Sequence, residues 1–200
     1  PKTEYPYNHP KFAGDESKPK DPYAPGKEYA GDADKDGKLT CFEAHPEWYG
    51  LYNGKRSDNI KDEFGDNYCT SNRDATLEMA KNIIASLADG KYRHVDILKL
   101  WMMDATRRWC QCAECAKQGT ETDRLMAMAD IMLRELKRAR SDGRLKRNVQ
   151  LASLAYVETI APPSKPLPKD FDYGNISITY FPIERCFDHA LADPSCTEYN

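Results

Sequence analysis

The 200-residue sequence lacks any long hydrophobic run, and this absence argues against a membrane span in the chain. A transmembrane helix needs roughly 20 consecutive apolar residues, and no stretch approaches that length. The sequence also lacks a strong charge of one sign, because 29 Lys and Arg against 32 Asp and Glu leave a formal net charge of −3. The one basic run, Lys137–Arg147, falls at a predicted helix end, where cations offset the helix dipole. We therefore expect no nucleic-acid partner.

Cysteine, in contrast, is abundant, with seven residues in the chain. That number is high for a cytosolic protein of this size and favours either an oxidising compartment or a metal site. A secreted, periplasmic or cell-surface location is therefore expected. Because the number is odd, at least one cysteine has no partner within the chain.

Regular secondary structure is predicted from residue 71 onward. Ser71 and Asn72 are candidate N-caps for a helix over residues 73–88, whose apolar positions fall on one face. A continuous apolar stripe predicts a second, clearer helix over residues 122–140. Short apolar runs predict buried strands over residues 95–103, 149–159 and 176–186.

Helices that alternate with apolar strands predict an α/β fold with a parallel sheet. We expect a partial or complete (β/α) TIM-like barrel of the glycoside-hydrolase type, although residues between the last two strands show no helical pattern. Three strands are too few to close a barrel, so the chain is expected to be a fragment of a larger protein. Residues 1–44 are predicted to form an irregular N-terminal segment, and residues 45–200 the barrel region.

Three acidic residues lie at or near the ends of the predicted strands, namely Asp104, Glu158 and Glu184. In α/β barrels the chemistry lies at the carboxyl ends of the strands, and glycoside hydrolysis needs a pair of carboxyl groups. Strand alternation would put Tyr156 on the face of Glu158, and Tyr180 on the face of Glu184. The alternative is ordinary polar loops, with neighbouring arginines either pairing with these acids or binding an acidic sugar.

Several motifs, taken in order, resemble one known family. They are HPEWYGLYNGKR (His45–Arg56), YCTSNRDA (Tyr68–Ala75), the WCQCAEC loop (Trp109–Cys115), LAYVETIAPP (Leu154–Pro163) and PIERCFDHALADPSC (Pro182–Cys196). Over residues 45–200 the chain is similar to the domain of unknown function 4838, found in secreted bacterial proteins of carbohydrate utilisation. The resemblance implies a TIM-barrel-like fold and a carbohydrate-directed role. Related proteins often carry an Asn-Asp pair where this chain has Met103–Asp104, which weakens a paired-acid mechanism there.

Residues 32–43 match the EF-hand loop pattern in full. The expected calcium ligands are Asp32, Asp34, Asp36, the Lys38 carbonyl and Glu43, with a glycine at the sharp turn. The alternative is a solvated acidic turn. No amphipathic helix precedes the loop and Pro46 cuts off a following one, so we expect a structural calcium clip and not a sensor.

Cys110, Cys112 and Cys115 form a C-x-C-x2-C cluster that could bind zinc. A fourth thiolate would have to come from Cys69, Cys186 or Cys196 to complete a tetrahedral site. The competing interpretation is disulfides or free thiols, including a Cys186–Cys196 bridge.

The functional hypothesis is a carbohydrate-active protein that hydrolyses glycosidic bonds with strand-end carboxylates as acid and base. Glu158 and Glu184 are the best acid/base candidates, and Asp104 supports or replaces one of them. The alternative is a non-catalytic carbohydrate-binding protein or a metal-stabilised structural domain. Candidate substrate-binding residues are His45, Trp48, Tyr156, Tyr180 and Arg185.

Overall fold

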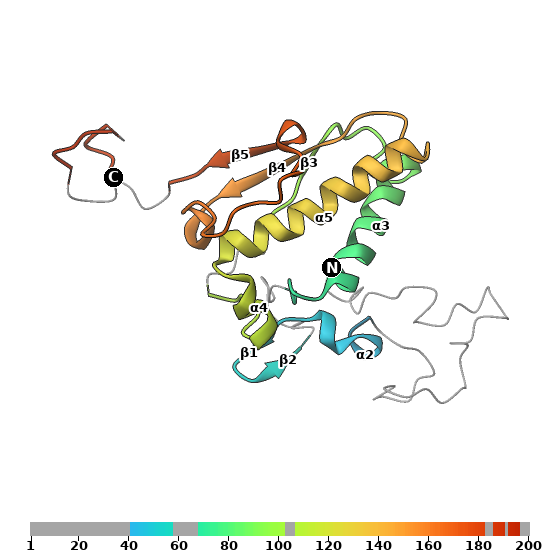
Figure 1. Cartoon of the computed structure of the whole chain (residues 1–200), viewed down its shortest axis with the longest axis horizontal. Helices are drawn as coiled ribbons and strands as arrows, with labels where there is room; N and C mark the ends of the chain where they lie inside the picture. The colour runs from blue at the N-terminus through green and yellow to red at the C-terminus, as the bar shows by residue number, and fades with distance from the viewer. Residues whose placement is uncertain (1–40, 58–67, 103–106, 183–185, 191, 197–200) are drawn as a thin grey trace. The chain divides into compact units, whose positions relative to one another are not determined.

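A three-stranded parallel sheet organises the larger part of the fold (Figure 1). Its strands are β3 (Ile97–Lys99), β4 (Gln150–Ala155) and β5 (Ile176–Tyr180), with β4 in the middle. In this register Leu151 pairs with Leu98 on one side and Ile176 on the other. The computed structural model describes residues 41–57, 68–102, 107–182, 186–190 and 192–196, with only the backbone of Cys41 and Glu43. The predicted parallel pairing is confirmed.

Two long helices accompany the sheet, as the apolar periodicity predicts. Helix α3 spans Arg73–Asp89, and Asn72 caps it by accepting a 3.0 Å hydrogen bond from the Ala75 amide. Helix α5 spans Glu121–Ser141 and starts at a capping box between Thr120 and Asp123. Both helices match their predicted ranges to within one residue at each end.

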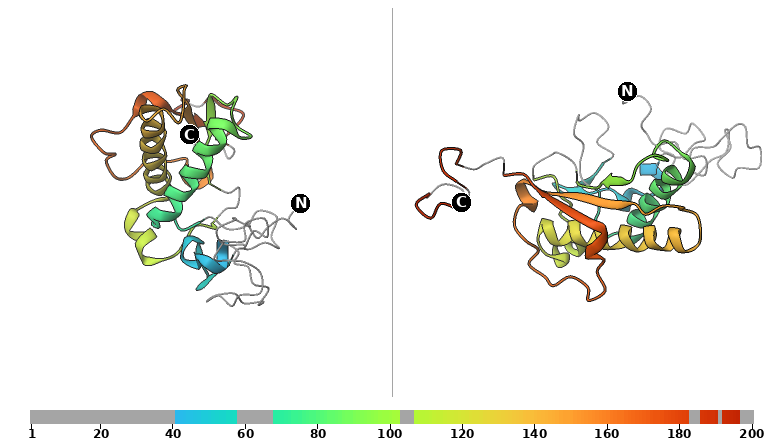
Figure 2. Two further views of the ribbon diagram at one scale, coloured as in Figure 1. Left: turned by 90° about the vertical axis from the view of Figure 1, so that its right-hand side faces the viewer. Right: turned by 90° about the horizontal axis from the view of Figure 1, so that it is seen from above.

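The core of this part lies between α5 and one face of the sheet. Helix α5 runs along the sheet (Figures 1 and 2). On the sheet side, Leu98 and Leu151 are buried, as is Val149 just before β4. The buried positions of α5 include the predicted stripe Leu125, Met128, Ala129, Met132, Leu133 and Leu136. The predicted stripe therefore forms the core-facing side of α5.

The strands are shorter than predicted, for local reasons. The chain enters β3 late because the Val95 amide bonds back to the Tyr92 carbonyl in a turn. Strand β4 ends at Ala155 because Val157, at φ 45°, turns left-handed. Strand β5 then has no ladder partner beyond Tyr180, which pairs with Ala155. Within the described chain, residues 100–102, 156–159 and 181–182 are not in strands, so the predicted extensions are wrong over those residues.

The chain divides into two compact units, which are residues 1–75 with 103–117 and residues 76–102 with 118–200. The sheet and α5 belong to the second unit. The described elements of the first unit before α3 are α2 (Cys41–Ala44), the 3-10 turn Pro46–Trp48, and strands β1 (Leu51–Tyr52) and β2 (Lys55–Arg56). Helix α4 (Ala113–Gln118) begins in this unit.

The β1–β2 hairpin is not among the predicted elements. Its two-residue turn consists of Asn53 and Gly54, with φ of 49° and 76°. Positive φ at both central residues is the signature of the type I′ turn, for which Asn-Gly is the favoured pair. The dipeptide itself was therefore the available signal.

No helix in the described residues is long and apolar enough to cross a membrane.

Between β4 and β5 the chain forms two short 3-10 turns, Val157–Thr159 and Tyr173–Asn175, and no α-helix. The missing helical pattern in that linker is thus confirmed, whereas closure of the sheet into a barrel remains a prediction.

Candidate sugar-binding edge and candidate metal centre

Two aromatic rings meet at the carboxyl end of the parallel sheet. Trp101 follows β3 and Tyr156 follows β4, and their ring centroids lie 5.7 Å apart at an interplanar angle of 57°. The Trp101 side chain remains 41% exposed. Because β3 and β4 are adjacent and parallel, the residues that follow both strands share one edge of the sheet. That edge therefore presents exposed aromatic surface.

Glu158 lies at the same edge, but not by strand alternation. It belongs to the 3-10 turn Val157–Thr159 that follows β4. The prediction that Glu158 and Tyr156 share a strand face is therefore wrong, because the strand has already ended. A left-handed conformation is rare for a β-branched residue such as Val157 and costs on the order of 1–3 kcal/mol. The turn that carries Glu158 therefore contains a residue, Val157, in an unfavourable backbone conformation.

Hydrogen bonds hold this strained turn in place. The Thr159 hydroxyl donates to the Leu154 carbonyl at 3.1 Å and to the Tyr156 carbonyl at 3.0 Å. After the turn, the Ala161 carbonyl accepts a 2.8 Å hydrogen bond from the hydroxyl of Thr122, at the start of α5. The segment that carries Glu158 is therefore fixed at both ends.

Asp123 in the first turn of α5 anchors the next part of the same loop. Its carboxylate accepts hydrogen bonds from the Ser164 hydroxyl at 2.6 Å and the Lys165 amide at 2.9 Å. It also accepts from the Thr120 amide at 2.7 Å. Burial acts to raise the pKa of Asp123, but these donors outweigh burial and the pKa is lowered well below its usual range. Asp123 is therefore held as a structural carboxylate.

The third strand contributes exposed aromatics to the described part of this edge. Tyr180 ends β5 and is 51% exposed, and the following Phe181 donates its amide to the Ala155 carbonyl at 2.9 Å. The predicted Asp104, Glu184 and Arg185 lie outside the described residues. Of the three candidate catalytic acids, the structure therefore describes Glu158.

The other two substrate-binding candidates belong to the first unit. The rings of His45 and Trp48 stack at a centroid distance of 3.8 Å and an angle of 4°. His45 Nδ1 also lies 3.0 Å from a carboxylate oxygen of Glu47. The flat, partly exposed stack could pack against a sugar ring. The stack can equally have a structural role, in which it stabilises the Pro46–Trp48 turn.

The predicted calcium ligands fall largely outside the described residues. Asp32, Asp34, Asp36 and Lys38 lie outside the described residues. Of Glu43 the structure describes only the backbone, within α2. The short helix does end at Ala44, before Pro46, as the sequence predicts. Calcium binding remains a prediction.

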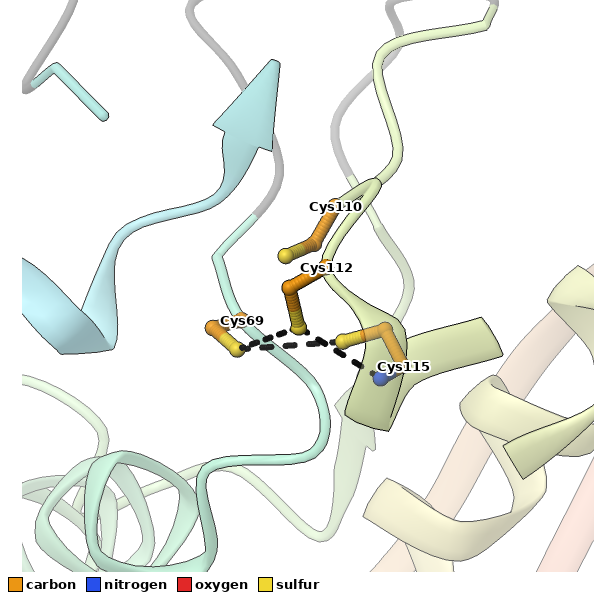
Figure 3. Close-up of side chains that lie close together, drawn as sticks. All are labelled: Cys69, Cys110, Cys112 and Cys115. Carbon is orange, nitrogen blue, oxygen red and sulfur yellow. Dashed lines mark hydrogen bonds between the residues drawn. The ribbon is translucent and has the colours of Figure 1, made fainter. Parts of the chain in front are cut away.

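Four cysteine side chains converge in the first unit (Figure 3). Cys69 Sγ lies 3.7 Å from Cys112 Sγ and 3.7 Å from Cys115 Sγ. With Cys110, the four sulfurs lie within 4.8 Å of one another. Cys69, Cys110 and Cys115 are almost fully buried, and Cys112 is partly buried. Of the three residues considered as a fourth thiolate, Cys69 joins the cluster.

The surroundings of the sulfurs alter their pKa values. Hydrogen bonding within the cluster, chiefly to Cys110 and Cys69, lowers the pKa of Cys115, whereas the contacts with Cys115 and Cys69 raise the pKa of Cys110. Burial acts to lower the pKa of Arg56, but its hydrogen bond to Cys69 and the nearby thiolate charges outweigh burial and raise that pKa. Within one cluster the pKa of Cys115 is thus lowered and that of Cys110 raised, and the Arg56 cation hydrogen bonds to a third member, Cys69.

A second, smaller group of metal-ligating residues lies near the C-terminal end of the described chain. Cys186 Sγ lies 3.1 Å from His189 Nδ1, and Cys196 completes a set whose ligand atoms lie within 4.8 Å of one another. The contact with His189 lowers the pKa of the Cys186 thiol. None of the six cysteines whose side chains the structure describes forms a disulfide.

Comparison with known protein families supplies one match, and it covers residues 36–200. The matching family is the domain of unknown function DUF4838. The chain belongs to this family. The match confirms the resemblance over residues 45–200 and extends it back to residue 36. The chain matches none of the curated proteins and none of the solved structures with which it was compared.

In this DUF4838 chain, the structure brings to the two sites several residues that are not among the predicted ones. Trp101 falls in a predicted buried strand, although an aromatic three residues before a strand-end acid is an available signal. Arg56 meets Cys69, and Ser71 meets Cys115, through contacts between segments far apart in sequence, which no spacing indicates.

Proposed function

We propose that this DUF4838 protein is carbohydrate-active and binds its sugar at the carboxyl edge of the β3-β4-β5 sheet. The observation that carries the proposal is the pair of rings from Trp101 and Tyr156, which lie 5.7 Å apart just after two adjacent parallel strands. Flat aromatic faces pack well against the apolar faces of sugar rings. The exposed Tyr180 and Phe181 extend the aromatic surface of the third strand.

The proposed reaction is hydrolysis of a glycosidic bond, with Glu158 as one of the two carboxyl groups. Glu158 follows β4 at the edge where parallel α/β enzymes place their chemistry, and the bonds from Thr159 and Thr122 hold its segment. Glu184 and Asp104 are the proposed partners. The fold proposed for the complete site is a (β/α) barrel, which the parallel pairing and the helix on one sheet face support.

The environment proposed for this protein is outside the cytoplasm, in a secreted, periplasmic or surface location. The calcium loop at Asp32–Glu43 is part of this proposal, since a weak site of this kind fills at extracellular calcium levels. We expect calcium to raise the melting temperature in a magnesium background, and Asp34→Asn to remove that rise. An unchanged melting temperature in wild-type protein would contradict the calcium site.

Binding is tested by titrating the protein with a panel of uronide and hexosaminide oligosaccharides under isothermal calorimetry. Trp101→Ala and Tyr156→Ala are each expected to raise the Kd for the bound glycan at least about tenfold, which corresponds to about 1.4 kcal/mol of binding free energy. Tyr173→Ala is the matched control, because Tyr173 is an exposed aromatic that precedes β5 at the opposite end of the strand. If Trp101→Ala and Tyr156→Ala bound the glycan as tightly as Tyr173→Ala does, the proposal that the sugar binds at this edge would be contradicted.

Hydrolysis is tested separately with aryl glycosides. Glu158→Gln is expected to lower kcat on the order of 100-fold or more while the glycan still binds, because the amide keeps the shape of the side chain but cannot transfer a proton. Full activity in this variant would remove Glu158 from the mechanism. Glycan binding without turnover in the wild-type protein would favour the second candidate, a non-catalytic carbohydrate-binding domain.

A further inference from the structure

We propose that Cys69, Cys110, Cys112 and Cys115 bind one structural zinc ion as a tetrathiolate. The proposal stands on the geometry of the first unit and does not depend on carbohydrate activity. Four sulfurs from two segments far apart in sequence lie within 4.8 Å of one another (Figure 3). Cys69 follows the bridge between Tyr49 and Tyr68, and the other three lie at or just before α4.

The sulfur separations fit a single tetrahedral ion. Zinc bonds sulfur at about 2.3 Å, so two thiolates on a tetrahedral zinc lie about 3.8 Å apart. Cys69 Sγ lies 3.7 Å from the sulfurs of both Cys112 and Cys115. No pair in the set exceeds 4.8 Å, so closure onto one ion requires shifts of at most about 1 Å. An iron–sulfur cluster distributes its thiolates over several irons and would spread them farther apart.

The pattern of contacts differs from what a disulfide requires. A disulfide joins two sulfurs at about 2.05 Å and leaves the others unengaged. Here Cys69 lies at the same 3.7 Å from the sulfurs of Cys112 and Cys115, and Cys110 also contacts Cys69 and Cys115, so the cysteines have several sulfur partners each. The Ser71 hydroxyl also lies 3.3 Å from the sulfurs of both Cys69 and Cys115.

Backbone amides supply hydrogen bonds to the sulfurs of the cluster. The amides of Leu51, Ser71 and Cys115 donate to the sulfurs of Cys110, Cys115 and Cys112 at 3.2, 3.4 and 3.4 Å. Such donors orient thiolate ligands and spread their charge.

A zinc tetrathiolate carries a net charge of about −2. The Arg56 guanidinium, from β2, hydrogen bonds to Cys69 and offsets part of that charge. We propose zinc and not iron(II) because a given site generally binds Zn²⁺ more tightly than Fe²⁺, and thiolate ligands suit zinc. With all four positions filled by protein, the ion would be structural and not catalytic.

The zinc hypothesis is tested on the full chain, purified without chelator and after equilibration with ZnCl2. Elemental analysis is expected to give about one zinc per chain. Replacement by CoCl2 is expected to give the thiolate-to-cobalt charge-transfer bands of a tetrahedral site. Less than about 0.2 equivalents of zinc after equilibration, or no thiolate-to-cobalt bands, would overturn the proposal without any variant.

Variants separate metal binding from packing. Cys112 is the least buried of the four, so Cys112→Ala should lose the zinc with the least disturbance, whereas Cys112→His should keep it because imidazole is also a zinc ligand. Ser177→Ala in β5 is the control, because it lies outside both groups of metal-ligating residues. Zinc retained by Cys112→Ala, or lost equally from Ser177→Ala, would overturn the assignment.

Chelator and reductant then distinguish zinc from disulfides. A zinc-selective chelator is expected to lower the melting temperature of the first unit by on the order of 10 °C or more, and a phosphine reductant to leave it unchanged. The opposite pattern would assign disulfides to these cysteines.

Discussion

In the middle of β4, Ser153 places a hydroxyl in the core between the sheet and α5. Its side chain is 2% exposed, and its Oγ has no hydrogen-bond partner within the described chain. A buried polar group without a partner costs about 1–3 kcal/mol. The apolar runs that predicted this strand could not show which of its polar residues would be buried.

We expect Ser153→Ala to raise the free energy of unfolding by about 1 kcal/mol, because it removes the unpaired hydroxyl and leaves only a small void. Urea denaturation measures the change. Ser177→Ala on the neighbouring strand is the control, since that exposed hydroxyl donates to the Leu151 carbonyl at 3.4 Å and should change stability little. A loss of more than about 1 kcal/mol in Ser153→Ala would mean that the hydroxyl is satisfied.

At the scale of elements, the junction between α5 and the loop after β4 depends on Asp123. One carboxylate caps α5 through Thr120 and also holds Ser164 and Lys165. The capping box was readable in sequence as a Thr followed three residues later by an Asp. The contact with Ser164 and Lys165 was not, because it joins residues 41 and 42 positions apart.

The junction should make stability depend on acid. The pKa of Asp123 is lower in the folded chain than the unfolded value of about 3.9, so the unfolded chain takes up the proton first as pH falls. Its stabilising contribution is therefore complete above about pH 5 and is lost progressively below about pH 4.

Asp123→Asn is expected to lower the free energy of unfolding by about 1–3 kcal/mol at pH 7 and to flatten its fall below pH 4. Urea titrations between pH 2 and pH 7 measure both effects. Asp130→Asn serves as a control, because its ion pair with Arg134 lies on the surface and contributes little. Parallel pH profiles for wild type and Asp123→Asn would contradict the role of the carboxylate.

At the scale of the whole molecule, the chain consists of two compact units with different sources of stability. The second unit has the apolar core of α5 and the sheet. In the first unit, the buried cysteines form a cluster with the partly buried Leu51. If zinc holds that cluster, its removal should act on one unit selectively.

Hydrogen exchange with mass spectrometry tests this selectivity. A zinc-selective chelator is expected to raise amide exchange in residues 48–56 and 107–117 and to leave α5 and β4 protected. Cys112→Ala should show the same pattern without chelator, and Ser177→Ala should not. Uniform loss of protection in both units would show that the chain unfolds as one cooperative block.

Local chemistry in the sequence determined the elements that depend on near neighbours. Helices α3 and α5 followed from apolar spacing, and α3 also from its candidate cap at Asn72, because a helix bonds within four residues. Apolar runs located the strands and helix–strand alternation predicted their parallel pairing, but their ends were decided by Val157 and by the ladder between Ala155 and Tyr180.

Only the tertiary structure decided which distant groups meet. Three cysteines close in sequence left three choices for the fourth, and the fold selected Cys69, because it is the segment after Tyr68 that meets the loop before α4. The same holds for Trp101 and Tyr156, which are far apart in the chain and adjacent only because β3 and β4 pair. Spacing along a chain states which ligands are available, and strand pairing and packing determine which of them share one site.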